Sequence, residues 1–356
     1  MKTVMPHFSG SIHPINLRAA AAHEYAALNA FENRILAERL PDDPPIPIAE
    51  AIQSWQNMPT DVDLFCWVIW NADGSALVAR GEAYVRHTDG YQHRAWFNLA
   101  VLPEFRQQGL GRRLLQPIVD VARSAQRRFL ETDTFDRVPA GAAFLQRLGA
   151  NKGQEMHINQ LVLTDLDRHL IGQWQTEAAE RTAEFDLGFW LGAWPEVHME
   201  AMTGLFNKAM NQQPHDQLDV EEIHFTPEQI RQFERYSLAR GVERWTLYVR
   251  ERKSGAFAGY TQVFWQPARP AILQQDATYV LPEYRNHGLG RWLKAAMLEK
   301  VLHERPQVQF VRSGNANSNA PMLKINLALG FKPYMAGCIW QAETEQMAKY
   351  LESKPA

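Results

Sequence analysis

The sequence is that of an ordinary globular chain, large enough for two hydrophobic cores. It has 356 residues, of which 46% are hydrophobic and 22% are charged. A formal net charge of −3 argues against a general attraction to nucleic acid or anionic membranes, and no apolar stretch approaches the length of a membrane span.

Hydrophobic periodicity predicts that the first half alternates strands and helices. The expected elements are, in order, a strand at Ile12–Arg18, helices at Ala19–Leu40 and Ile48–Asn57, strands at Leu64–Trp70, Ala76–Val85 and Tyr91–Val101, a helix to about Ala125, a strand at Phe129–Asp133, a helix at Ala140–Leu148 and a strand at Met156–Leu163.

The polar segment Thr164–Ala183 predicts a helical connector, and the second half then repeats the same order of elements. They are a strand at Phe185–Leu191, helices at Glu196–Met210 and Thr226–Arg240, strands at Trp245–Arg250, Ala256–Trp265 and Ile272–Val280, a helix, a strand at Val308–Arg312, a helix at Asn317–Leu329 and a strand at Lys332–Gln341. We therefore expect an N-terminal domain at 1–163, a connector at 164–183 and a C-terminal domain at 184–356. Each domain would be a mixed sheet with helices on both faces, in the α/β (α+β) class.

The two cysteines, Cys66 and Cys338, lie in apolar strand-like runs of different halves, which favours buried free thiols over a disulfide or a metal site. The histidines show no metal-binding spacing, so we expect no metal. Met1–Gly10 lacks the apolar core of a signal peptide. These features predict a cytoplasmic protein.

One segment is repeated. Val280–Arg291 and Val101–Arg112 are identical at nine of twelve positions, 179 residues apart. A second pair of glycines, Gly149 and Gly330, recurs 181 residues apart. Two landmarks in the same order and at nearly the same spacing indicate the duplication of a whole domain.

Each repeated segment predicts an anion site. Its glycines lie in a loop before an amphipathic helix, where they allow a ligand to approach the backbone and where the helix N-terminus adds partial positive charge. Arg285 and Arg291 flank the second loop, and His287 lies inside it, where it could cover a bound group. The best ligand for such a loop is a phosphate.

The order of elements and the Arg-x-x-Gly-x-Gly motif resemble the GCN5-related N-acetyltransferases (GNAT superfamily), and the duplication resembles their tandem members, with a mycothiol synthase-like architecture. The resemblance implies two tandem GNAT domains, each a mixed, mostly antiparallel sheet flanked by helices. It also implies that the loops bind the pyrophosphate of acetyl-CoA, or another acyl-CoA, as co-substrate. The implied cofactor residues are Tyr279, Val280, Arg285, Asn286, His287, Gly288, Leu289, Gly290 and Arg291, and in the first half Val101, Arg106, Gln107, Gln108, Gly109, Leu110, Gly111 and Arg112.

Further features of the family separate the two halves. The resemblance implies that the strand before the loop splays from its neighbour at a bulge, so that its backbone can pair with the pantetheine arm; this corresponds to about 278–280 and 99–101. It also implies a CoA-contacting Asn eleven residues before the later glycine, which is Asn319 in the second half, whereas the first half has Val138 there. We therefore expect the second domain to be active and the first to bind CoA weakly or to serve as a scaffold.

The catalytic residues depart from the family. Many GNATs have a Tyr as general acid four residues before that glycine, but the positions here are Asn326 and Leu145. Asn326 could donate a hydrogen bond to the leaving sulfur, and Tyr334 could replace the acid or simply pack in the sheet. Asp276, on the strand that enters the second loop, is the candidate base, with a surface ion pair as the alternative.

The sequence thus predicts an acetyl-CoA-dependent N-acetyltransferase that transfers an acetyl group directly to the amine of a small molecule. The alternative is a non-catalytic acyl-CoA-binding sensor or scaffold, because both halves lack the usual Tyr. We expect no nucleic-acid partner, no membrane partner, and a monomer or homodimer; modification of nucleic acid or histone tails is disfavoured by the mild charge.

Overall fold

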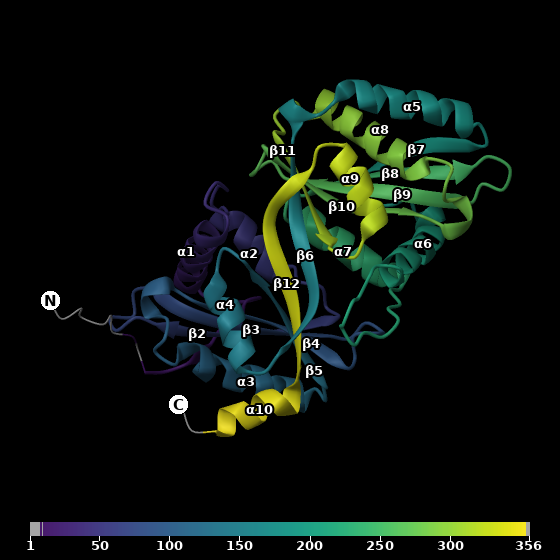
Figure 1. Ribbon diagram of the computed structural model, residues 1–356. Coiled ribbons are helices and arrows are strands. Elements are labelled where there is room, and N and C mark those ends of the chain that lie inside the picture. The colour runs from purple at the N-terminus through teal and green to yellow at the C-terminus, as the bar shows by residue number, and fades with distance from the viewer. Residues whose placement is uncertain (1–7, 9, 354–356) are drawn as a thin grey trace. The chain divides into compact units, whose positions relative to one another are not determined.

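The computed structural model of the chain describes residue 8 and residues 10–353, which form two compact units (Figure 1). The first unit consists of residues up to 154 together with 217–221 and the residues from 337 onward. The second consists of residues 155–216 and 222–336. Most of Met1–Gly10, where no signal peptide is expected, lies outside the described residues.

The first unit is a six-stranded sheet with strand order β1-β2-β3-β4-β5-β12. Only β4 and β5 pair in parallel. Its elements are β1 (His13–Pro14), α1 (Ala22–Arg39), α2 (Ile48–Gln56), β2 (Val62–Trp70), β3 (Leu77–Arg86), β4 (Arg94–Val101), α3 (Leu110–Ser124), β5 (Phe129–Phe135), α4 (Pro139–Arg147), β12 (Lys332–Glu343) and α10 (Thr344–Glu352).

The second unit repeats this design with strand order β6-β11-β10-β9-β8-β7, in which only β10 and β11 are parallel. Its elements are β6 (Asn151–Val162), α5 (Arg168–Arg181), β7 (Phe185–Leu191), α6 (Met199–Asn211), α7 (Pro227–Ala239), β8 (Glu243–Glu251), β9 (Phe257–Trp265), β10 (Ile272–Val280), α8 (Leu289–Glu304), β11 (Phe310–Ala316) and α9 (Ala320–Ala328). The expected mixed, mostly antiparallel sheets are therefore confirmed.

The two units exchange their last strands. β12, from the end of the chain, pairs with β5 from Gly337 to Glu343 and completes the first sheet. β6 pairs with β11 through Met156–Val162 and so belongs to the second sheet. The predicted ranges 1–163 and 184–356 instead kept each strand in its own half, because hydrophobic periodicity identifies a strand but not its partner. The structure thus groups the residues differently from these ranges.

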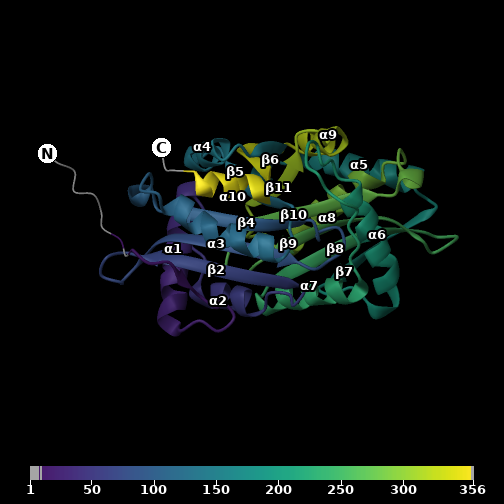
Figure 2. The same cartoon turned by 90° about the horizontal axis from the view of Figure 1, so that it is seen from below.

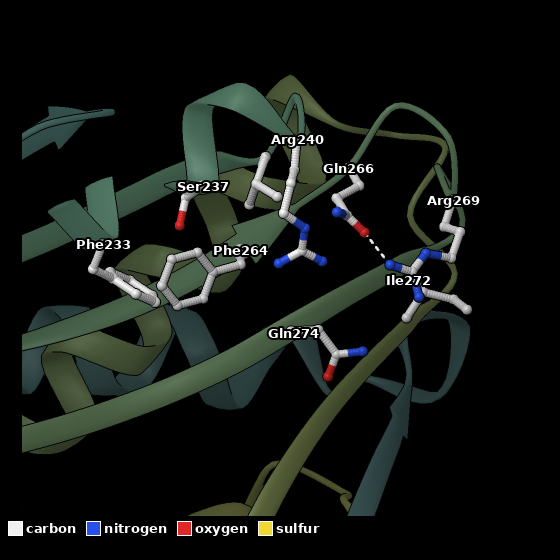
Figure 3. A pocket seen from close by; sticks show the side chains of 9 residues that line it. Phe233, Ser237, Arg240, Phe264, Gln266, Arg269, Ile272 and Gln274 are labelled. Carbon is white, nitrogen blue, oxygen red and sulfur yellow. Dashed lines mark hydrogen bonds between the residues drawn. The ribbon is translucent and has the colours of Figure 1, made fainter. Parts of the chain in front are cut away.

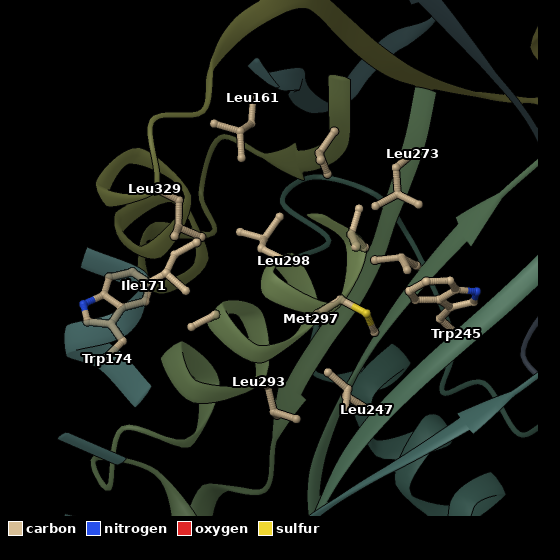
Figure 4. Packing of buried hydrophobic residues seen from close by; sticks show 14 of the residues in the cluster. Leu161, Ile171, Trp174, Trp245, Leu247, Leu273, Leu293, Met297, Leu298 and Leu329 are labelled. Atoms are coloured by element: carbon tan, nitrogen blue, oxygen red, sulfur yellow. The ribbon is translucent and has the colours of Figure 1, made fainter. Parts of the chain in front are cut away.

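The segment expected as a helical connector, 164–183, is helical at Arg168–Arg181 and contributes side chains to the second core. Within it, α5 buries Ile171, Trp174 and Ala178. Ile171 and Trp174 pack in one cluster with Leu293 and Met297 of α8 (Figure 4). Its polar composition reflects the outer face of the helix. In the first unit α10 lies beside α3 in the same way (Figures 1 and 2).

Helices cover both faces of each sheet. In the second unit α5, α8 and α9 pack on one face, and α6 and α7 pack on the other (Figure 1). The other helices and strands follow the predicted order, with two differences. The strand expected at Ile12–Arg18 is reduced to His13–Pro14, and α10 was not predicted. Both cysteines are free and buried, as predicted. No helix in the described part of the chain combines the length and the apolar composition needed to cross a membrane.

Candidate active site

The repeated loop of the second unit presents a row of free backbone amides. Asn286 and Gly288 both have left-handed backbones, with φ of 68° and 83°, and this curls the chain just before α8 begins at Leu289. Among the described residues, the N–H groups from Asn286 to Gly290 donate to no protein acceptor. Consecutive free amides at a helix N-terminus form a concave anion site. The structure therefore brings the predicted loop residues together as a phosphate site would require.

The loop of the first unit has the same backbone. Gln107 and Gly109 have φ of 61° and 78°, and α3 starts at Leu110. The N–H groups from Gln107 to Gly111 likewise have no protein acceptor within the described residues. Backbone geometry alone thus makes both loops competent for an anion.

The loop arginines distinguish the two units. Each turns back onto the preceding strand end: Arg285 Nε donates to the carbonyl oxygen of Val280 at 3.1 Å, and Arg106 Nε to that of Val101 at 3.0 Å. A terminal nitrogen of Arg285 also donates a hydrogen bond to the neutral amide oxygen of Gln212 at 2.6 Å. Arg106 instead forms a two-pronged ion pair with a carboxylate, that of Glu38, at 2.7 and 2.5 Å. The positive charge beside the loop is therefore neutralised in the first unit only.

Arg112 and Arg291, the third residues of α3 and α8, contact the neighbouring helices rather than the loop amides. Arg112 donates to carbonyl oxygens of Tyr350 and Leu351 at the end of α10, at 3.3 and 2.9 Å. Arg291 is exposed and lies 5.5 Å from the ring centre of Trp174 on α5. Both therefore tie the central helix to its neighbour, and the prediction that Arg291 brackets the anion stays untested.

The strands before the loops also differ. β10 pairs with β11 only as far as Gln275 and Ser313, and β4 pairs with β5 only as far as Trp96 and Glu131, so both strand pairs splay. The register of β10 against β9 shifts between Gln275 and Thr278, which is a β-bulge. β4 pairs with β3 without interruption. The expected bulge is thus present in the second unit and absent from the first.

Asp276 lies inside this bulge. Its side chain reaches solvent, but protein atoms around the carboxyl raise the pKa of Asp276 by desolvation, against weaker opposing effects of the Ala277 backbone and of Arg244. The hydroxyl of Tyr260 is fully buried, has no hydrogen-bond partner among the residues that the structure describes, and interacts electrostatically with Asp276. Sequence reasoning missed Tyr260, because an aromatic residue on a strand is usually core. A carboxyl with a raised pKa is better suited to accept a proton near neutral pH.

A pocket opens beside α7 in the second unit (Figure 3). Its walls come from α7, β9 and β10, and include Phe233, Phe264, Arg240 and Gln274. Gln274 lies two residues before Asp276 on β10. Asp276 interacts electrostatically with Arg244, which donates to Glu234 of α7. The volume of the pocket is about 240 Å³. No pattern in the sequence pointed to it, because its walls come from three separate elements.

The other predicted catalytic residues have different neighbours. Tyr334 is half-buried, and its hydroxyl accepts a hydrogen bond from Arg312 at 3.4 Å, with the guanidinium 4.5 Å from its ring centre. Asn319 is the N-cap residue of α9, and its side chain makes no capping hydrogen bond. Asn326 is buried and bonds to Lys294 and Asn315. Asp276, Tyr334 and Asn326 therefore contribute to three separate sets of contacts.

Lys294 was missed by sequence reasoning. It lies on α8 and is 1% exposed, and its amine donates to Asn326 Oδ1 at 2.8 Å. The only available signal was a lysine at the position where the first half has Leu115. Among the described residues, no group of histidine, cysteine and acidic side chains could hold a metal ion.

Comparisons with known proteins agree with this geometry. The family model described as "Acetyltransferase (GNAT) family" matches residues 29–150 and 207–331, more than half of the chain. A tandem GNAT protein from the clavulanic acid biosynthesis pathway is similar in structure, with a TM-score of 0.74 and 26% identity over 94% of this chain and 99% of that chain. A GCN5-related N-acetyltransferase from Sphaerobacter thermophilus shares the fold, with a TM-score of 0.66 and 13% identity over 94% and 96%. No curated protein is significantly similar in sequence.

Proposed function

This chain belongs to the acetyltransferase (GNAT) family, and we propose that its second unit moves an acetyl group from acetyl-CoA to the amine of a small molecule by direct transfer. The observation that carries the proposal is the end of β10. There a bulge at 275–278 presents Asp276, and the strand continues without a partner from β11 into a loop of free amides. The amides would serve the pyrophosphate of acetyl-CoA, the unpaired strand its pantetheine arm, and Asp276 the amine that attacks its thioester.

The residues of the second unit fit the donor. The N–H groups from Asn286 to Gly290 would donate to the pyrophosphate oxygens, and the backbone of Thr278–Val280 would pair with the amides of the pantetheine arm. When bound, acetyl-CoA supplies a thioester carbonyl that an amine can attack. A backbone N–H released from the ladder by the bulge would donate to the oxyanion that develops there.

Asp276 is the proposed base. Its carboxylate would remove a proton from the attacking amine, directly or through a water molecule. The pocket of Figure 3 would hold the rest of the acceptor. Two phenyl rings and two guanidinium groups in its wall, from Phe233, Phe264, Arg240 and Arg269, suit an acceptor that carries an apolar portion and an acidic or polar group beside its amine.

The first unit is proposed to bind CoA weakly or to act as a scaffold. Its loop backbone is intact, but Glu38 neutralises Arg106 and β4 lacks the bulge. We further propose a cytoplasmic location, since both cysteines are free thiols, and acceptors that are small molecules, because the net charge of −3 gives no attraction to nucleic acid.

The proposal is tested by titrating acetyl-CoA into the full chain and then measuring release of free CoA thiol with a panel of amines, with and without an acidic group. Binding of one acetyl-CoA with release that depends on the amine supports the proposal. Binding without release for any amine supports the acyl-CoA sensor instead. If acetyl-CoA does not bind, both are excluded.

A further inference from the structure

Four polar side chains form a buried network in the second unit. Lys294 Nζ donates to Asn326 Oδ1 at 2.8 Å, and Asn326 Nδ2 donates to Asn315 Oδ1 at 2.8 Å. Asn159 on β6 donates to the same oxygen of Asn315 at 3.5 Å. All four residues are less than one-tenth exposed. The network links α8, α9, β11 and β6.

The amine of Lys294 is under-satisfied. An ammonium group has three donors, and Asn326 Oδ1 is the one acceptor that Lys294 contacts in the described part of the chain. It has no carboxylate partner there, although the ring of Phe331 lies 5.6 Å away. Burial alone therefore lowers the pKa of Lys294 to about 7. A buried lysine without an anion is costly for the fold, so a role outside stability is expected.

The network lies where the strands separate. Asn315 is two residues beyond the last pair of the β10–β11 ladder, Gln275 and Ser313. Lys294 is one helical turn beyond Gly290, the last residue of the loop with free amides. A ligand that places a diphosphate on the loop and inserts its other end between β10 and β11 would bring that end to the amine.

The first unit shows that the fold does not need this network. The positions of Lys294 and Asn326 correspond there to Leu115 and Leu145, six residues after Gly109 and four before Gly149. Both leucines are buried in an ordinary apolar cluster. The polar pair thus occurs in the unit that also has the bulge and the un-neutralised loop arginine.

We propose that Lys294 is a further catalytic residue, whose ammonium group donates a proton to the sulfur of the departing CoA. This rests on the proposed function. The acceptor nitrogen forms its bond to the carbonyl carbon, the carbon–sulfur bond breaks with its electron pair on sulfur, and one N–H proton of Lys294 moves to sulfur. Asp276 holds the proton of the acceptor amine and releases it to solvent, from which Lys294 is protonated again. Asn326 is a positioning residue for the amine.

Within the described ranges, the titratable groups on the neighbouring elements have other surroundings. Lys324 on α9 is exposed, and His157 on β6 bonds to Asn317 at 2.7 Å. Arg312 on β11 donates a hydrogen bond to Gln160. Asp276 on β10 interacts electrostatically with Arg244, on the face of the sheet that α6 and α7 cover. A proton donor with a pKa near neutrality is well matched to a thiol, whose ordinary pKa is about 8.5.

The experiment follows the CoA thiol itself. In full-length wild type, thiolate absorbance of bound CoA should titrate at lower pH than that of free CoA, because the ammonium group stabilises the thiolate. In Lys294→Met this shift should vanish, and kcat should fall by about 100-fold, while acetyl-CoA affinity changes less than about threefold. Lys294→Arg, which keeps a charge but cannot donate readily, should keep the shift in part and lose kcat.

Folding is controlled by two further variants. Lys294→Leu combined with Asn326→Leu reproduces the apolar pair of the first unit and should fold, with the same losses as Lys294→Met. Leu115→Met should leave kcat unchanged. If the thiol of bound CoA ionises at the same pH in wild type and in Lys294→Met, the catalytic role of Lys294 is overturned and the proposed function is not. Absence of CoA binding to wild type would overturn it together with the proposed function.

Discussion

Glu38 holds both terminal nitrogens of Arg106, at 2.7 and 2.5 Å, whereas a terminal nitrogen of the equivalent arginine of the second unit, Arg285, donates to the neutral amide of Gln212. The two loops have the same backbone, so this difference in one partner changes the charge that a phosphate would meet. At the short range of a loop and with partial burial, such a charge contributes measurably to anion affinity.

The loops are compared directly by placing the same charge in each. Gly288 and Gly109 both have a left-handed backbone, and a Cβ at either position would meet no atom within 4 Å. We expect Gly288→Glu to reduce acetyl-CoA affinity more than about 100-fold, because a carboxylate then faces the phosphates, and Gly109→Glu to have little effect on the tight site. Titration calorimetry measures both. Gly288→Ala controls for backbone strain, and the reverse ranking would assign the cofactor to the first unit.

Removing the carboxylate should strengthen the first site. Glu38→Gln gives Arg106 an amide partner like the one Arg285 has. Because the guanidinium charge is then no longer neutralised, we expect a second, weaker acetyl-CoA site to appear in the titration. Gln212→Glu is the converse change, which should weaken the site of the second unit by about tenfold. If neither variant alters binding, the loop arginines do not contribute to cofactor selection.

Much of this site could be predicted from the sequence, because it depends on local features. Gly288 and Gly109 mark left-handed turns whatever surrounds them, and their repetition identified the duplication. Lys294 and Glu38 could not be predicted in this way. Their importance comes from contacts with Asn326 and Arg106, which are 32 and 68 residues away. The exchange of β6 and β12 was missed for a similar reason, since the hydrophobic pattern of one strand does not determine which strand it pairs with.

Asp276 gives a pH-dependent prediction. The base must be ionised, and the pKa of Asp276 is raised, so kcat/KM should fall as the pH drops through a value above that of an ordinary aspartate. Asp276→Asn should lower kcat/KM by about 100-fold at neutral pH and remove this acidic limb. Acetyl-CoA affinity serves as the control and should not change. An acidic limb that persists in the variant would show that another group is the base.

The α5 helix gives a prediction on stability. Trp174 is 6% exposed and packs against α8. Trp174→Ala should therefore lower the free energy of unfolding of the second unit by about 3–5 kcal/mol. The exposed His169 on the same helix is the control, and His169→Ala should change it by less than about 0.5 kcal/mol. Urea unfolding measures both; a loss below about 1 kcal/mol for Trp174→Ala would mean that the segment is a connector after all.

Lys294 should also affect how the free energy of unfolding depends on pH, with no substrate present. Its pKa is lowered to about 7 in the folded chain, whereas an unfolded lysine titrates near 10.4. Between these values the unfolded chain binds one more proton at this site, so the stability of wild type should rise with pH by about 1.4 kcal/mol per unit relative to Lys294→Met. Below pH 7 the difference in free energy of unfolding between wild type and Lys294→Met should be constant, with Lys294→Met more stable. Unfolding of both proteins from pH 6 to 10 measures this, and the double leucine variant should follow Lys294→Met. Parallel stability curves for wild type and Lys294→Met would mean that the amine stays charged when folded, and it would then need an anion that none of its contacts supplies.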